Sequence, residues 1–459
     1  MTFKEYINTL RGKAVAAAGA GISNTPLIEA LLAEGIDVTV CDKRHSEKLG
    51  EAAHRFGEMG AKLRLGDKYL DDLEADVIFR TPGLMPTDPA LQLAVRRGAL
   101  LTSEMEVFFD VCPCRIIAVT GSDGKTTTTS IITEILRNEG KAVHVGGNIG
   151  APLLCGADDM DPDDIVVLEL SSFQLCTMGK SPDIAVMTNL SPNHLDVHAS
   201  FEEYFDAKRN IYTHQKRRDR AIFNLDNEYT RACAETAPGE VAFFSRREKV
   251  GNGVYLDGGT IYEAADGYSE AVMQADGIRL PGVHNIENFM AAFAAVRGLA
   301  GHPAMLEAAR EFRGVPHRIE LVREHRGIRY YNDSIASSPT RTIAGLKAFK
   351  KKVILIAGGK DKGVAFDGLG EEIVSHVKTL VLTGLTAERI RSSVINAPGY
   401  KGEPEIIMRD DFTDAVLAAA EAADKGDVVL LSPACTSFDR FKNFEQRGDL
   451  FREIVTDLE

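Results

Sequence analysis

Residues 115–130 read Arg-Ile-Ile-Ala-Val-Thr-Gly-Ser-Asp-Gly-Lys-Thr-Thr-Thr-Thr-Ser, and this stretch decides the fold. Residues 116–119 are apolar and mostly β-branched, which predicts a buried strand. A glycine-bracketed turn follows, then Lys125 and an apolar helical pattern that starts at residue 131. This order predicts a phosphate-binding loop, in which backbone N–H groups and the positive end of a helix dipole contact phosphate oxygens.

The loop also supplies side chains suited to phosphate and metal. Lys125 provides a mobile cation for the outer phosphates, and the hydroxyl of Thr126 provides a ligand for Mg²⁺. The generic motif has a glycine six residues before the lysine, where this chain has Val119. The loop is therefore a shorter form, Thr-Gly-x-x-Gly-Lys-Thr-Thr.

The composition limits the class of protein. The chain has 459 residues, 44% of them hydrophobic, enough for about three domains of the usual size. Its formal net charge of −14 argues against a nucleic-acid-binding surface. We expect neither a signal peptide nor a membrane span, because no apolar stretch reaches about 18 residues. The seven cysteines show no disulfide framework, which predicts reduced thiols in the cytoplasm.

The N-terminal residues predict a Rossmann-like βα unit. Two strands are expected here, over residues 14–18 and 38–41. The turn Gly19-Ala20-Gly21 and the strand-ending Asp42 nearly match a dinucleotide-binding fingerprint. Asn24 replaces its third glycine, so another nucleotide or a sugar diphosphate is favoured over NAD. A further strand over residues 76–79 leads into the turn Thr81-Pro82-Gly83.

Two further expected strands end in polar residues. In residues 165–170, Glu169 stands inside the apolar run Ile-Val-Val-Leu-Glu-Leu. A buried carboxylate is costly unless it is paired or bound to metal, so we interpret Glu169 as an acid linked to Mg²⁺; a salt-bridged glutamate is the alternative. Residues 184–188 lead to His194-Leu-Asp-Val-His198. Without a further ligand cluster this run does not favour zinc, and His194 near a Mg²⁺–phosphate site is the better interpretation.

Other central residues are ambiguous by themselves. Lys208 lies in an expected helix over residues 201–212, where a solvated surface lysine is the simplest interpretation. Asn285 and Asn288 open an apolar helix, and asparagine at a helix start is commonly a cap. Residues 240–280 predict a small additional sheet.

The third expected domain begins near Gly314. Its expected strands cover residues 329–332, 353–357, 380–382 and 428–431. Polar clusters follow these strands, at residues 333–339, 358–363 and 432–439, and a charged turn at residues 315–320 precedes them. An open α/β sheet binds its ligand at the carboxyl ends of its strands, so these clusters predict a binding site.

These motifs together resemble the Mur ligase family from end to end. Four motifs occur in the same order as in the family: Thr120–Thr127, Gly146–Gly150, Leu168–Leu175 and Asn189–Asp196. The most discriminating stretch, Leu431–Gly448, reads Leu-Ser-Pro-Ala-Cys-Thr-Ser-Phe-Asp-Arg-Phe-Lys-Asn-Phe-Glu-Gln-Arg-Gly. It is similar to the D-glutamate-adding members, and the Asp-Asn-Pro-Arg motif of the diaminopimelate-adding members is absent.

The resemblance implies an α/β fold of three domains. These are a Rossmann-like UDP-sugar-binding domain (1–112), a central phosphate-loop ATP-binding domain (113–313) and a Rossmann-like domain for the amino acid and ATP (314–459). It implies a cytoplasmic, monomeric ligase that uses ATP and Mg²⁺ to add D-glutamate to UDP-N-acetylmuramoyl-L-alanine through an acyl phosphate. Such an enzyme serves peptidoglycan synthesis, and hence cell shape and division, with small molecules as its partners and no nucleic acid or membrane.

By position, the resemblance also implies site residues. The expected catalytic residues are Lys125, His194, Lys208, Glu169 and Asn148. The expected ATP-binding residues are Gly121, Ser122, Asp123, Gly124, Lys125, Thr126, Thr127, Asn285, Asn288, Arg318 and Asp333. The UDP-sugar is expected at Ser23, Asp42, Lys43, Arg44, Thr81 and Gly83, and D-glutamate at Lys362, Ser437, Phe438, Phe444 and His317. The expected metal site involves Thr126, Glu169, His194 and Lys208, which stands where the family carries a carbamylated lysine.

One departure from the family concerns residue 335. The family commonly has Asn-Asp-Ser-Lys-Ala-Thr-Asn, whereas this chain has Asn-Asp-Ser-Ile335-Ala-Ser-Ser. One charged contact is therefore absent or supplied elsewhere, and Lys360 is the candidate. Two alternatives to the main interpretation are a folylpolyglutamate synthase-like ligase and a nucleotide-binding protein without catalysis. The 110 residues before the phosphate loop argue against the first, and the intact catalytic set argues against the second.

Overall fold

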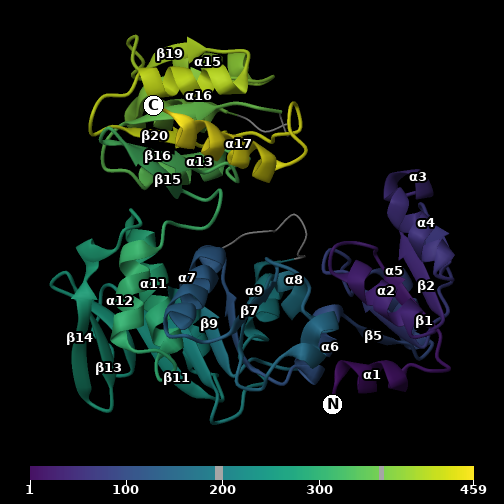
Figure 1. Ribbon diagram of the computed structural model, residues 1–459. Coiled ribbons are helices and arrows are strands. Elements are labelled where there is room, and N and C mark those ends of the chain that lie inside the picture. Colours follow the sequence, from purple (N-terminus) through teal and green to yellow (C-terminus); the bar gives the residue numbers. More distant parts are fainter. Residues whose placement is uncertain (192–199, 361–365) are drawn as a thin grey trace. The chain divides into compact units, whose positions relative to one another are not determined.

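The computed structural model describes residues 1–191, 200–360 and 366–459 (Figure 1). These residues form two compact units: unit 1 comprises residues 1–276 and 287–308, and unit 2 comprises residues 277–286 and 309–459. The predicted site residues His194 and Lys362, and also His198, lie outside the described residues. Among the described helices, none has both the length and the apolar character needed to cross a bilayer.

Unit 1 begins with a five-stranded parallel sheet in the order β3-β2-β1-β4-β5. Its strands are β1 (Val15–Ala18), β2 (Val38–Asp42), β3 (Lys62–Leu65), β4 (Val77–Arg80) and β5 (Leu100–Thr102). Its helices are α1 (Phe3–Thr9), α2 (Asn24–Ala33), α3 (Ser46–Leu49), α4 (Glu51–Glu58), α5 (Pro89–Arg96) and α6 (Glu104–Val111). Every residue of β1 and β4 is buried, as expected where helices cover both faces of a parallel sheet.

The second sheet of unit 1 has nine strands in the order β14-β13-β12-β11-β10-β9-β6-β8-β7. The parallel strands are β6 (Arg115–Thr120), β7 (Val143–Gly147), β8 (Ile165–Glu169), β9 (Ile184–Met187), β10 (Arg220–Asn224), β11 (Glu240–Ser245) and β12 (Gly253–Asp257). Strands β13 (Thr260–Ala265) and β14 (Tyr268–Gln274) add an antiparallel edge. The small sheet predicted over residues 240–280 is therefore a continuation of the central sheet, because β12 pairs with β11.

Two of the remaining helices of the central region, α7 and α11, carry predicted nucleotide-site residues. The remaining helices are α7 (Lys125–Asn138), α8 (Ser172–Leu175), α9 (Phe201–Arg209), α10 (Glu228–Ala234), α11 (Val283–Val296) and α12 (His302–Glu311), with the short 3₁₀ helices η1 (Leu154–Asp159) and η2 (Ala275–Gly277). Helices α7 and α11 lie side by side (Figure 1). The hydroxyl of Thr128 donates to Asn288 Oδ1 at 3.3 Å across this contact.

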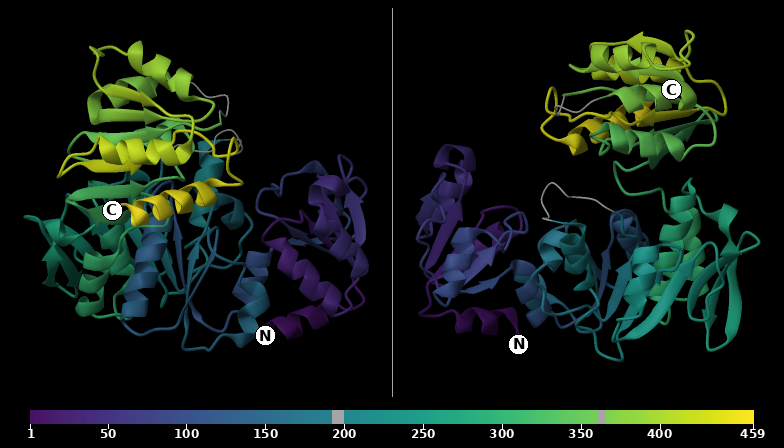
Figure 2. Two further views of the ribbon diagram at one scale, coloured as in Figure 1. Left: turned by 45° about the horizontal axis from the view of Figure 1, so that its top comes forward. Right: turned by 180° about the vertical axis from the view of Figure 1, so that it is seen from behind.

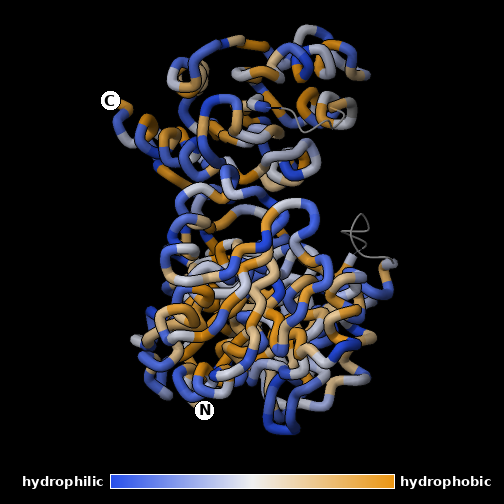
Figure 3. Tube along the Cα trace, turned by 90° about the vertical axis from the view of Figure 1, so that its right-hand side faces the viewer, coloured by the Kyte–Doolittle hydropathy of each residue, from blue (hydrophilic) through white to orange (hydrophobic). Residues whose placement is uncertain are grey.

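The two sheets of unit 1 share one hydrophobic core. Val40 and Phe79 of the N-terminal sheet, Phe108 of α6, and Leu168 and Met187 of the central sheet belong to the same cluster of buried side chains. In Figure 3 the hydrophobic stretches of this unit, drawn in orange, run mainly through its interior. This shared core explains why residues 1–112 and most of residues 113–313, predicted as two domains, fall in one compact unit.

Unit 2 is a three-layer α/β structure with the strand order β15-β16-β20-β17-β18-β19. Its strands are β15 (Glu320–His325), β16 (Ile328–Asn332), β17 (Val353–Ala357), β18 (Val377–Leu382), β19 (Glu405–Met408) and β20 (Val428–Leu431). One face packs on α13 (Pro339–Lys347), α14 (Asp367–His376) and α15 (Ala387–Ile395), and the other on α16 (Phe412–Glu421) and α17 (Phe444–Asp457) (Figure 2). The four strands predicted in this region are confirmed.

Candidate active site

The phosphate loop joins β6 to α7, as the sequence predicts. Gly121 has a φ of +150° and Gly124 has a φ of +80°, values that strongly favour glycine. A Cβ at Gly121 would lie 2.0 Å from Thr188 Oγ1, and one at Gly124 would lie 2.4 Å from Asn288 Oδ1. Both glycines are therefore required by close approach as well as by backbone conformation.

Polar contacts hold the loop against the end of β9. The backbone N–H groups of Ser122 and Asp123 donate to the main-chain and side-chain oxygens of Asn189, each at 2.9 Å. The hydroxyl of Thr188 donates to Asp123 O at 2.6 Å. Lys125 Nζ lies over the loop and donates to Gly121 O at 3.0 Å. The cation that the sequence assigned to phosphate is thus held at the loop itself.

Glu169 ends β8 next to this loop and is 2% exposed. Its Oε1 accepts a hydrogen bond from Asn148 Nδ2 at 2.8 Å. Its Oε2 is buried and has no hydrogen-bond partner among the described residues. An unpaired buried carboxylate oxygen is costly, so the site suits a cation that supplies the missing contact.

Lys208 of α9 is 2% exposed, so the solvated-surface interpretation of its sequence is wrong. Its Nζ donates to Thr120 Oγ1 at 3.2 Å and lies 4.9 Å from the centre of the Tyr204 ring. Burial, followed by the charge of Lys125, holds the pKa of Lys208 well below its usual value. The negative charge of Glu169 opposes this shift without cancelling it.

A cavity of about 310 Å³ opens beside Asn148 in unit 1. It contains four predicted site residues: Ser23, Thr81, Gly83 and Asn148. Its other lining residues are Ile22, Arg80, Pro82, Ser103, Glu104, Met105, Gly147, Gly150, Pro152 and Gln174. The structure therefore brings part of the predicted UDP-sugar site together with a predicted catalytic residue.

The other predicted UDP-sugar residues lie at the end of β2 and directly after it. Asp42 is 4% exposed and accepts hydrogen bonds from Ala20 N at 2.9 Å and from Arg44 Nη2 at 2.8 Å. Burial would raise the pKa of Asp42, but the hydrogen bonds from Arg44 and Ala20 outweigh it and lower the pKa to about 2. Asp42 thus fixes the glycine turn after β1, and Lys43 is exposed beside it.

The third position of the dinucleotide fingerprint has a structural role. Asn24 is fully buried, and its Nδ2 donates to Gly19 O at 2.9 Å and to Phe79 O at 3.3 Å. The amide therefore ties the start of α2 to the ends of β1 and β4, where a glycine would leave a gap.

The predicted ATP residue Asp333 in unit 2 is buried at the end of β16. Its Oδ2 accepts a hydrogen bond from Ser432 Oγ at 2.8 Å. Burial raises the pKa of Asp333 to about 7, although the charges of Arg318 and Arg341 oppose the shift. Arg341 also donates to Ile335 O at 3.3 Å, so a cation that the sequence reasoning missed lies next to the position where the family lysine is lost.

The remaining predicted residues differ in burial and in their contacts. Asn285 is buried, and its Nδ2 donates to Pro281 O at 2.6 Å. Lys360 is exposed, and its main chain pairs with that of Thr436. Ser437 is 2% exposed, whereas Phe438 is 62% exposed at the same edge of the sheet.

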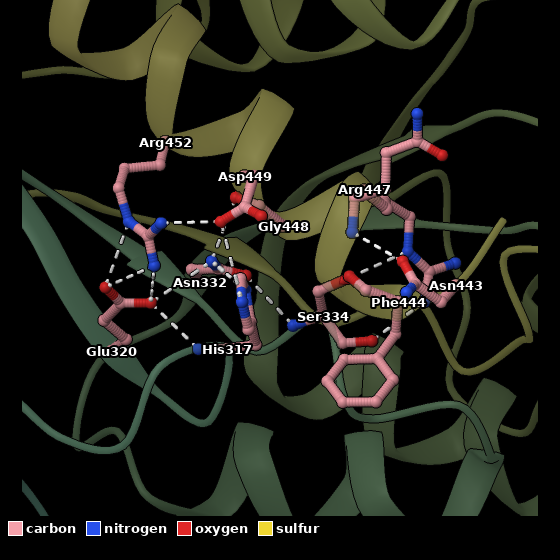
Figure 4. Close-up of polar contacts among 11 residues, drawn as sticks. His317, Glu320, Asn332, Ser334, Asn443, Phe444, Arg447, Gly448, Asp449 and Arg452 are labelled. Atoms are coloured by element: carbon pink, nitrogen blue, oxygen red, sulfur yellow. Dashed lines mark hydrogen bonds and ion pairs between the residues drawn. The ribbon is translucent and has the colours of Figure 1, made fainter. Parts of the chain in front are cut away.

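His317 is the centre of a polar network (Figure 4). Its Nδ1 lies 3.0 Å from Asn332 Nδ2, and its ring meets the predicted D-glutamate residue Phe444 edge-on at 5.9 Å. Glu320 accepts the main-chain N–H of His317 at 2.8 Å and two hydrogen bonds from Arg452 Nη2. Burial lowers the pKa of His317, against the charge of Glu320.

Arg447 is a buried cation that the sequence reasoning did not single out (Figure 4). Its Nη2 donates to Ser334 O at 2.8 Å and its Nε to Ser334 Oγ at 3.0 Å, and the guanidinium also reaches Cys435 O. Burial lowers the pKa of Arg447 to about 10. The residue lies inside the quoted 431–448 motif, but only the tertiary contacts show that it joins the loops after β16 and β20.

The fold and the loop define a phosphate-loop α/β protein. A family model of the Mur ligase middle domain matches residues 119–296, and one of the Mur ligase glutamate ligase domain matches residues 317–435. A curated protein of Clostridium novyi is 49% identical over 459 residues, covering 100% of this chain and 99% of that protein. One of Ruminiclostridium cellulolyticum is 48% identical and covers 99% of each. Both are named UDP-N-acetylmuramoylalanine–D-glutamate ligase. The chain belongs to the Mur ligase family.

Solved structures agree on the fold. A UDP-N-acetylmuramate–alanine ligase of Thermotoga maritima matches with a TM-score of 0.57 at 18% identity, covering 97% of this chain and 99% of that chain. A UDP-N-acetylmuramoyl-L-alanyl-D-glutamate–2,6-diaminopimelate ligase matches with a TM-score of 0.56 at 20% identity, covering 92% and 93%. The predicted α/β architecture is thereby confirmed.

Glu104, which lines the cavity, gives a prediction on pH. Burial raises its pKa from 4.5 to about 7, although hydrogen bonds from Leu154 and Leu153 oppose the shift. Between pH 4.5 and about pH 7, the folded state keeps the proton of Glu104 while the unfolded state releases it. The stabilisation that this bound proton gives to the folded state is therefore lost as the pH rises through about 7. We expect the unfolding free energy of Glu104→Gln, relative to wild type, to increase by about 2–3 kcal/mol from pH 5 to pH 8.

Urea denaturation at the two pH values measures this difference. Glu74→Gln, at an exposed loop position, is the matched control. Its unfolding free energy relative to wild type should be the same at both pH values. A pH-independent difference for Glu104→Gln would contradict the assignment.

Proposed function

We propose that this chain is an ATP-dependent ligase that joins D-glutamate to the L-alanyl carboxyl group of UDP-N-acetylmuramoyl-L-alanine. The observation that carries the proposal is the cluster of Lys125, Glu169 and Lys208 around one phosphate loop. The choice of substrates rests on the relatives of that name, which match the chain along its whole length at 48–49% identity.

The proposed chemistry begins with activation of the acceptor. A carboxylate is a poor electrophile, so its oxygen first attacks the γ-phosphorus of ATP, the bond to the β–γ bridging oxygen breaks, and ADP leaves. The protein contributes positioning and charge neutralisation, which dominate phosphoryl transfer. We propose that Lys125 and N–H groups at the start of α7 hold the phosphate oxygens, because Ser122 N and Asp123 N already donate to Asn189.

Mg²⁺ fits the residues present. The unpaired Oε2 of Glu169 and the hydroxyl of Thr126 in the first turn of α7 are oxygen ligands, which Mg²⁺ prefers alongside phosphate. When bound, Mg²⁺ would neutralise negative charge on the transferring group. The predicted ligand His194 lies outside the described residues and stays part of the proposal.

Amide formation then requires a neutral amine. The nitrogen of D-glutamate attacks the acyl carbon, a proton leaves the nitrogen, and phosphate departs. We propose His317 as the proton acceptor, because its lowered pKa favours the neutral imidazole. His194 is the second candidate for this role. Ser437, Phe438, Phe444 and Lys362 are the residues proposed to surround the amino acid.

Lys208 is proposed to act as a carbamate. Its neutral amine attacks CO₂, and loss of one proton leaves an anionic carbamate. The side chain thereby becomes an anion that can act as a metal ligand. The lowered pKa supports this step, because only the unprotonated amine is nucleophilic.

The remaining substrate contacts are proposed from the cavity and the strand ends. We assign the cavity with Ser23, Thr81 and Gly83 to the UDP-sugar acceptor. The relatives match the N-terminal sheet as well as the catalytic region, which favours this acceptor over a folate. We place the reaction in the cytoplasm and expect a monomer.

Substrate dependence tests the proposed function. With ATP, Mg²⁺ and UDP-N-acetylmuramoyl-L-alanine, we expect rapid phosphate release with D-glutamate and at least about tenfold less with L-glutamate or without an amino acid. Phosphate release and the amide product are measured in the same samples. Equal release with L-glutamate would remove the D-glutamate assignment, and no amide with either isomer would contradict the ligase assignment.

A second prediction concerns Lys208. Lys208→Met should reduce kcat by at least about 100-fold, because a group that acts on the transferring phosphoryl is lost. Wild type in CO₂-free buffer should lose activity and regain it with bicarbonate, and ¹³C-bicarbonate should give a carbamate NMR signal. The control Lys216→Met changes an exposed lysine and should retain both properties. Full activity of Lys208→Met would refute the role.

A further inference from the structure

Arg80 is a buried arginine that links two walls of the acceptor cavity. It is the last residue of β4 and is 1% exposed. Its Nη2 donates to Phe173 O at 2.9 Å and to Thr177 Oγ1 at 2.8 Å, and lies 3.2 Å from Cys176 Sγ. Its Nη1 donates to Leu84 O at 3.3 Å. One guanidinium thus joins the N-terminal sheet to the end of α8.

The hydroxyl of Thr177 connects Arg80 to the carboxyl group of Glu106. Thr177 accepts the hydrogen bond from Arg80 and donates its own proton to Glu106 Oε2 at 3.2 Å. Ser103 Oγ also donates to Glu106 Oε2, at 2.8 Å. Burial raises the pKa of Glu106, and the charge of Arg80 opposes that shift. The cluster therefore connects β4, the start of α6 and the end of α8.

A buried charged cluster is a poor device for stability alone. Removing a guanidinium and a carboxylate from water costs several kcal/mol per ion, and apolar side chains of similar volume often stabilise a core as well or better. The Nε of Arg80 adds to this cost, because it is buried without a hydrogen-bond partner among the described residues. What the cluster provides is a fixed geometry, since the planar guanidinium constrains several partners at once.

The elements that Arg80 joins both carry residues that line the cavity, and those after β4 include predicted ligand contacts. Thr81 and Gly83 follow it directly, and α8 carries Gln174, which is 5% exposed and lines the same cavity. Gln174 is itself held in a capping box with Ser171. The distance between these two walls of the cavity therefore depends on the hydrogen bonds of Arg80.

We infer that Arg80 is a positioning residue for the nucleotide-sugar acceptor, which sets the separation of the Thr81–Gly83 turn and Gln174 so that both contact the same ligand. This inference rests on the proposed function of the cavity. Arg80 acts through its neighbours, so its loss affects acceptor affinity and leaves the phosphoryl-transfer residues in place.

The test compares the full-length wild type with Arg80→Met, Arg80→Lys and the double variant Arg80→Met/Glu106→Gln. The double variant avoids leaving Glu106 as an unpaired buried charge, so it decides the question if Arg80→Met does not fold. Calorimetry measures the Kd of UDP-N-acetylmuramoyl-L-alanine, and initial rates give kcat and the KM of ATP. Arg97→Met, at an exposed arginine of the same unit, is the control.

We expect the acceptor Kd to rise at least about tenfold in Arg80→Met and in the double variant, because small misplacements of binding groups are costly. Arg80→Lys should restore part of the affinity, and kcat at saturating acceptor and the KM of ATP should stay within about twofold of wild type. An unchanged acceptor Kd in the double variant overturns the inference, as does an equal rise in the KM of ATP. Failure of the wild type to bind this acceptor instead overturns the proposed function, and the inference with it.

Discussion

The hydrogen bond between Lys208 Nζ and Thr120 Oγ1 joins α9 to the end of β6, at the point where the phosphate loop begins. It places a buried amine beside the buried carboxylate of Glu169 and the cation Lys125, so that three ionisable side chains of the central region converge on one loop. The loop can hold this position because Gly121 and Gly124 allow contact with Thr188 and Asn288 that a larger residue would prevent. Backbone geometry and electrostatics thus depend on each other here.

Hydrogen bonding gives similarly buried carboxyl groups different pKa values in this fold. Asp42 receives hydrogen bonds from Arg44 and Ala20, which hold its pKa at about 2, and it organises a turn as an anion. Glu104 and Asp333 are buried with fewer compensating contacts, and the pKa of each rises to about 7. Burial and hydrogen bonding together therefore set the pKa, and hence the charge, of each of these carboxyl groups.

The sequence predicts local structure well and long-range partners poorly. Apolar runs bounded by glycine and polar residues located the strands, and the phosphate loop was recognisable because its parts are contiguous. The helix pattern by itself favours a surface position for Lys208, and only the family resemblance indicates a catalytic role, because nothing in its helix reveals that Thr120 and Glu169 lie near it. Arg80, Arg447 and Arg341 were missed for the same reason, since their partners lie on other segments. The shared core of the first two sheets also depends on contacts that hydrophobic periodicity does not specify.

The most direct test of phosphoryl transfer at the phosphate loop is chemical trapping of the acyl phosphate. Wild type is incubated with ATP, Mg²⁺ and UDP-N-acetylmuramoyl-L-alanine without D-glutamate, and borohydride then reduces any acyl phosphate to an alcohol that mass spectrometry detects. We expect the alcohol with wild type and at least about 100-fold less with Glu169→Gln, which lacks the carboxylate next to the phosphate loop. No alcohol with wild type, or equal amounts with Glu169→Gln, would contradict phosphoryl transfer at this cluster.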